Sequence, residues 1–144
     1  MEAPFHQRAA FTLLRIVAPF VIMQHGAQKL FGVLGGFGAP GHTARLFSLM
    51  GLAGVIEFFV ALFVMLGLFT RVAAFIVSGE MATAYFLVHR PQGFWPIRNH
   101  GELPVLFCFT FLFFAAYGGG RWSLDALLFR KRGGPQAETA VRAV

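Results

Sequence analysis

Four long apolar stretches, each interrupted by few ionisable residues, limit what this chain can fold into. They run over about residues 9–30, 46–69, 72–88 and 103–117. A helix that crosses a bilayer needs about 20 consecutive apolar residues, with a usual range of roughly 17 to 25. The first two stretches have this length, the third is short, and the fourth needs flanking residues to complete a crossing. The sequence therefore predicts an all-α fold, a transmembrane four-helix bundle.

The composition also favours a membrane protein over a soluble one. Hydrophobic residues make up 57% of the 144 residues and charged residues 12%, about half of the roughly 25% that is usual in soluble domains. The chain contains 19 Phe, more than a soluble domain of this size can hide from water. Its one cysteine, Cys108, allows neither an intramolecular disulfide nor a CxxC redox pair. These features argue against a soluble enzyme, a disulfide scaffold and a disordered chain.

Glycine, proline and basic residues divide the chain and set its expected orientation. A Gly/Pro loop at 32–41, a tight turn at 67–71 and a longer loop from residue 90 separate the helices. We expect a domain over 1–128 and a basic, disordered tail over 129–144. Both termini are expected in the cytoplasm, because seven basic residues lie on their side of the membrane and four on the other. The seven are Arg8, Arg71, Arg121, Arg130, Lys131, Arg132 and Arg142, and the four are Lys29, Arg45, Arg90 and Arg98.

Three ionisable residues, Arg15, Glu57 and Glu80, fall inside the apolar stretches. Each opposes insertion by roughly 3 kcal/mol if it is left unpaired, so we expect all three to face the bundle interior and one another. They lie about 10, 18 and 13 Å from the cytoplasmic helix ends, depths at which the arginine can reach either acid. Two acids beside one arginine favour a shared or retained proton, which suits quinone or proton chemistry. The alternative is a structural cluster that fixes helix register.

A second polar group is expected at the opposite, outer edge of the bundle. It contains His25 and Lys29 at the end of the first helix, His89 at the end of the third, and His100 and Glu102 before the fourth. Histidine exchanges protons near neutral pH, so these residues are candidates for a substrate mouth. The more common role of each such residue alone is that of a polar anchor at the membrane interface. No HxH, HExxH or CxxCH spacing occurs, so we predict no metal site. The scattered basic residues do not predict nucleic-acid binding.

Several short motifs of this chain, taken in order, match the pattern of a known protein family. They are Arg15, Gly26–Gly32, Gly54–Glu57, Gly67–Arg71, Glu80–Met81, Asn99–Glu102 and Gly118–Asp125. With these motifs in this order, over roughly residues 8–128, the chain resembles the DoxX family of small four-helix membrane proteins. The resemblance implies a multi-pass protein of the bacterial inner membrane. It also implies a link to quinone-linked oxidoreductases, including thiosulfate:quinone oxidoreductase, or to membrane complexes that handle thiol and oxidative stress.

The leading functional hypothesis is an integral membrane subunit of a quinone-linked oxidoreductase system. Arg15, Glu57 and Glu80 would bind quinone or relay protons, and the outer group would admit a small substrate. No intrinsic redox centre is evident in the sequence, so quinone is the expected cofactor and electrons must come from a partner subunit or a bound reductant. Partners are the lipid bilayer, a redox subunit and further copies of the chain. The alternatives are a non-enzymatic assembly or structural subunit, and a small-solute or proton transporter.

Overall fold

The computed structural model describes residues 4–129, and within this range every regular element is a helix. The all-α prediction is therefore confirmed for the described residues, whereas the predicted tail lies outside them except for Phe129. The orientation of the termini stays a prediction. The elements are α1 (Phe5–Phe31), α2 (Leu49–Val55), η1 (Ile56–Val60), α3 (Ala61–Leu66), α4 (Thr70–Ala84), η2 (Tyr85–His89), η3 (Arg90–Gln92), α5 (Pro96–Asn99), α6 (Glu102–Tyr117) and α7 (Leu124–Leu128).

Each predicted stretch corresponds to one continuous helical rod. The first is α1, the second is α2–η1–α3, the third is α4–η2–η3 and the fourth is α6. The first three span Phe5–Phe31, Leu49–Leu66 and Thr70–Gln92, and they are long and apolar enough to cross a membrane. The fourth, Glu102–Tyr117, has 16 residues. η1 and η2 are short π-helical segments inside the second and third rods, where the backbone adopts i→i+5 hydrogen bonds.

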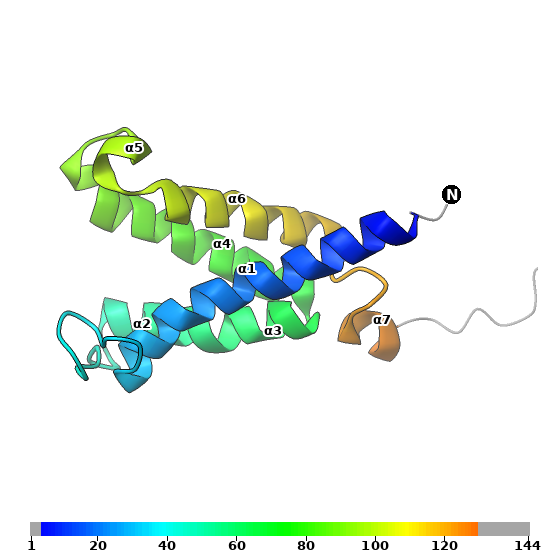
Figure 1. Ribbon diagram of the computed structural model, residues 1–144, viewed down its shortest axis with the longest axis horizontal. Coiled ribbons are helices and arrows are strands. Elements are labelled where there is room, and N and C mark those ends of the chain that lie inside the picture. Colours follow the sequence, from blue (N-terminus) through cyan, green and yellow to red (C-terminus); the bar gives the residue numbers. More distant parts are fainter. Residues whose placement is uncertain (1–3, 130–144) are drawn as a thin grey trace, which may run out of the picture.

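The four rods form two pairs that separate toward one end of the molecule. α1 packs along α2, η1 and α3, and α4 packs along α6. In Figure 1 the pairs lie close together near α7 and apart near α5 and the loop between α1 and α2. We call these the α7 end and the α5 end. The two pairs are therefore farther apart in the half of the bundle near α5.

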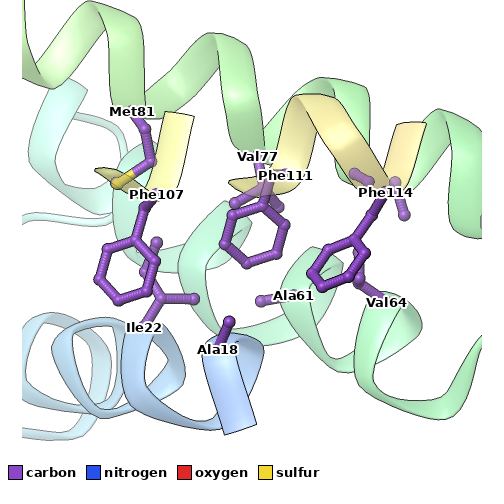
Figure 2. Packing of buried hydrophobic residues seen from close by; sticks show 11 residues of the cluster. Ala18, Ile22, Ala61, Val64, Val77, Met81, Phe107, Phe111 and Phe114 are labelled. Carbon is purple, nitrogen blue, oxygen red and sulfur yellow. The ribbon is translucent and has the colours of Figure 1, made fainter. Parts of the chain in front are cut away.

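A row of aromatic rings from α6 fills the space where the two pairs meet. Phe107, Phe111 and Phe114 are buried and point toward α1 and α3, as Figure 2 shows. Small residues stand opposite them, including Ala18 of α1 and Ala61 of α3. Helices in a membrane associate through close packing of this kind, because lipid chains are as apolar as the side chains. The core therefore joins the pairs through the middle of the bundle and toward the α7 end.

Charged side chains at the α7 end form hydrogen bonds with backbone groups at the ends of helices. The carboxylate of Asp125 accepts hydrogen bonds from the backbone N–H groups of Phe69 at 2.7 Å and Thr70 at 2.9 Å, where α4 begins. Arg71 donates to the carbonyl oxygen of Ala116 at 2.6 Å, in the last turn of α6. The first N–H groups and last carbonyls of a helix have no partner within it, and leaving them unpaired in a membrane is costly. These contacts close the α7 end.

Candidate functional site

A cavity of about 510 Å³ lies between the two helix pairs, in the half of the bundle near α5. α1, α2, η1, α4, η2 and α6 all contribute to its wall. Its floor is the edge of the core, because Ile22, Met81 and Phe107 belong both to the packed cluster and to the cavity lining. Most of the lining is aliphatic. The ionisable side chains that line it are His25, Lys29, Glu57, Glu80, His89 and His100.

An ion pair between Lys29 and Glu57 forms one wall of the cavity. Lys29 Nζ lies 2.5 Å from both carboxylate oxygens of Glu57, whose side chain is only 5% exposed. Gly26, one turn before the lysine, makes this contact possible. A Cβ at Gly26 would lie 2.7 Å from the backbone nitrogen of Phe58 and 2.9 Å from the carbonyl oxygen of Gly54. The missing side chain thus lets α1 approach η1 closely enough for the two charges to meet.

Glu80 lines the same cavity from α4 and interacts electrostatically with both Glu57 and Lys29. Its Oε2 atom is buried and has no hydrogen-bond partner within residues 4–129. A buried polar atom without a partner costs roughly 1–3 kcal/mol, and more if the group is charged. The described part of the fold therefore leaves this carboxyl oxygen without a partner, in a residue that lines the cavity.

Histidines line the cavity toward the α5 end. His89 Nδ1 lies 2.9 Å from the carbonyl oxygen of Asn99. Because a carbonyl oxygen only accepts, Nδ1 carries the proton, and in the neutral ring Nε2 is left as an acceptor. Asn99 is itself fixed, since its Nδ2 donates to the carbonyl oxygen of Gly93 at 2.5 Å and its Oδ1 accepts from the backbone N–H of Gly101 at 2.8 Å. The loop before α6 thus holds one face of His89. Across residues 4–129, no group of three or more His, Cys, Asp or Glu is arranged to hold a metal ion.

Arg15 does not reach the cavity, and the predicted meeting of Arg15 with the two acids is wrong. Its Nη1 donates to the carbonyl oxygens of Val64 at 3.0 Å and Met65 at 2.7 Å, and its Nη2 donates to that of Trp122 at 2.6 Å. The first two carbonyls lie in the last turn of α3, where helix carbonyls carry partial negative charge, and that of Val64 also accepts from the capping N–H of Gly67 at 3.0 Å. Arg15 therefore bonds to a nearer acceptor at the α7 end, about 10 Å along the rod from Glu57.

Gly67 makes room for Arg15 where α3 ends. It has a left-handed backbone with φ of 71°, a conformation that glycine adopts without strain. A Cβ there would lie 2.7 Å from Arg15 Nη1 and 2.5 Å from the Cβ of Ser123. The turn motif thus positions an arginine that joins α1, α3 and the segment before α7.

The structure merges most of the two predicted groups into one site. Glu57 and Glu80, expected deep in the bundle, share the cavity with His25, Lys29, His89 and His100, expected at the outer edge. Glu102, the fifth residue predicted at that edge, begins α6, is exposed and does not line the cavity. Sequence reasoning placed Lys29 and Glu57 in different groups and missed their pairing. Depths counted from the opposite helix ends would have indicated the Lys29–Glu57 pair, because Glu57 lies only about 12 Å from the start of α2.

Comparison with known proteins places the chain among membrane proteins. The DoxX family model matches residues 10–90. A protein of Haemophilus influenzae, described as uncharacterized, is 42% identical over 125 residues, which cover 82% of this chain and 90% of that protein. An uncharacterized membrane protein of Mycobacterium tuberculosis is 30% identical over 135 residues, covering 82% and 80% of the two chains. No solved structure matches.

Replacing Arg15 by Lys should lower stability. A lysine keeps the charge, but its single ammonium nitrogen cannot occupy the positions of both Nη1, which bonds to the carbonyls of α3, and Nη2, which bonds to that of Trp122. We expect a loss of about 1–3 kcal/mol for each carbonyl left without a partner, measured as a lower midpoint of thermal unfolding in mild detergent. Arg98→Lys, at an exposed position of α5, is the control. Equal midpoints for both variants would contradict this role of Arg15.

The Lys29–Glu57 pair should show strong coupling in a double-mutant cycle. Lys29→Met and Glu57→Gln each leave one buried group without its partner, which costs about 3–5 kcal/mol when the partner stays charged. The double variant removes both charges, so it should be more stable than the sum of the single losses predicts. Chemical unfolding of the four proteins in detergent micelles measures this difference. Strictly additive losses would show that the two side chains do not interact in the folded protein.

Proposed function

Because the chain belongs to the DoxX family of multi-pass membrane proteins, we propose that it is a quinone-binding subunit of a quinone-linked oxidoreductase system. The proposed location is the bacterial inner membrane. The proposed site is the cavity near the α5 end, with Lys29, Glu57 and Glu80 around the quinone head group. Arg15, which the sequence suggested for this role, serves instead to hold the α7 end together.

The observation that carries the proposal is a polar corner inside an otherwise aliphatic cavity. Its volume of about 510 Å³ falls within the roughly 300–1,000 Å³ that is usual for small-molecule sites. A quinone head group has the matching chemistry, because its ring is largely apolar and its two carbonyl oxygens accept hydrogen bonds. Lys29 Nζ supplies a donor, and Glu80 Oε2 is a buried oxygen with no partner in the described chain. Ionisable groups at such depth usually mark a functional site.

Reduction of a quinone to a quinol requires two electrons and two protons. In this site Lys29 can hold a carbonyl oxygen of the head group by a hydrogen bond. Glu80 can exchange a proton with the same ring, and the histidines that line the cavity can exchange protons with water at the α5 end. A partner subunit or a bound reductant supplies the electrons. The proposed contribution of this chain is therefore to bind the quinone and to move protons.

Substitutions of Glu80 test the proposal, because this residue makes no hydrogen bond through Oε2 that folding would lose. Glu80→Leu should leave the unfolding midpoint unchanged or raise it, yet weaken quinone binding by at least about tenfold. Glu80→Gln should keep the hydrogen bond to the ring but lose proton exchange. Binding is measured by titrating quinone into protein reconstituted in lipid nanodiscs. Mass spectrometry of purified protein measures how much quinone it retains.

Glu102→Gln is the matched control, since it removes a carboxylate that is exposed and outside the cavity. It should bind quinone like the parent protein. Quinone that is no more abundant in the purified protein than in the surrounding lipid would refute the proposal. A tightly retained partner protein in that case would favour the assembly role, and proton or solute flux into liposomes would favour transport.

A further inference from the structure

The cavity wall is incomplete on the side where α2 and α4 face each other. Leu52 of α2 and Leu87 of η2 both line the cavity, yet they are 55% and 57% exposed. α2 packs against α1 and η1, and α4 packs against α6, η1, α3 and η2. No comparable packing joins α2 to α4 in the described part of the chain. Side chains there face the cavity and the surroundings of the bundle at once.

Helical spacing shows that Glu80 lies at this gap. Residues 76, 80 and 83 of α4 are separated by four and three positions, so they share one helix face, and Leu87 of η2 also lines the cavity. Ile76, Thr83 and Leu87 are exposed, whereas Val77 and Met81 on the adjoining face are buried in the core. The Thr83 hydroxyl donates to the carbonyl oxygen of Gly79 at 2.9 Å, so this face offers the bilayer no unpaired hydroxyl. Glu80 is thus the ionisable residue of this helix face.

The other approach to the cavity, at the α5 end, contains exposed histidines and a loop that is partly held in place by hydrogen bonds. His25 and His100 are exposed there. Tyr85 Oη donates to the carbonyl oxygen of Phe94, and Asn99 is hydrogen-bonded on both sides of its amide. Phe94, Trp95 and Ile97 are also exposed at this end, so it combines apolar and polar side chains, as membrane–water interfaces do. The histidines at the α5 end can exchange protons with water.

We infer that the gap between α2 and α4 is a lateral portal through which a long-tailed, lipid-soluble ligand enters from the bilayer. The polar head group passes Glu80 and reaches Lys29, while the hydrocarbon tail stays between Leu52 and Leu87 and extends into the lipid. The identity of the head group rests on the proposed function. The added claim concerns the substrate class and its route: the natural ligand carries a long apolar chain and does not come from water.

Bulky substitutions at the portal test the route. Leu52→Trp and Thr83→Trp each place an indole in the gap, and Phe75→Trp is the control because Phe75 is an exposed residue of α4 outside the cavity. Each protein, in lipid nanodiscs, is titrated with a full-length isoprenoid quinone and with the same quinone lacking its tail. The portal variants should bind the long-tailed quinone at least about tenfold more slowly, and the tail-less quinone within about threefold of the parent rate. Equal effects on both quinones, or no effect, would overturn the portal.

A second measurement does not depend on quinone binding. The parent protein is reconstituted in vesicles whose phospholipid carries a photoreactive diazirine at the end of an acyl chain, irradiated and analysed by mass spectrometry. Labelling should reach the cavity-lining residues Ala53 and Ala84 and decrease in Thr83→Trp. Labelling confined to outward residues such as Phe75 would overturn the portal. Labelling of the cavity without quinone binding would reject the proposed function alone, and quinone binding without such labelling would reject the portal alone.

Discussion

The contact between Lys29 and Glu57, made among lipid-facing helices, is the interaction on which the rest of the structure depends. Separate charges in a membrane interior are expensive, so each of these side chains needs the other. Their 2.5 Å contact requires α1 and η1 to lie as close as Gly26 allows. As a result, α1 packs against the second rod near the α5 end. α4 and α6 are left to pair with each other, and a cavity remains between the two pairs.

The two ends of the bundle use their charged side chains differently. At the α7 end Arg15, Arg71 and Asp125 bond to backbone groups at helix ends, which stabilises the fold and leaves those groups with partners. At the α5 end Lys29 and Glu57 bond to each other and still face an open space. A ligand can interact with the second set without breaking the caps of any helix. The geometry thus separates residues that hold the rods together from residues that can take part in chemistry.

Hydropathy predicts the four rods because their length is fixed by the thickness of the bilayer, a constraint visible in sequence. The partners of Arg15 and Glu57 were harder to predict. Depth alone allowed an Arg15–Glu57 contact. In the structure the backbone carbonyls of Val64 and Met65 bind the arginine instead. Every residue type has such a carbonyl, so the sequence does not mark which one will be the acceptor. η1 and η2 were also missed, because a π-helical turn arises from packing between neighbouring helices and has no composition of its own. The contacts of Arg15 and the π-helical segments were both missed because they depend on the backbone and not on residue type.

Within residues 4–129, Glu80 is the acid at membrane depth that keeps a buried oxygen without a partner. Arg15 has three carbonyl partners, although its Nε is buried without one in the described part of the chain, and Glu57 has a lysine, so most of the cost of burying each is offset within the chain. Glu80 Oε2 is buried and has no such partner among residues 4–129. A residue that only fixed helix register would gain stability from a partner, as Glu57 does. The cost of an unpaired carboxyl is more readily explained if a molecule from outside the chain supplies the missing hydrogen bond, and the aliphatic wall around Glu80 indicates a molecule that is itself largely apolar.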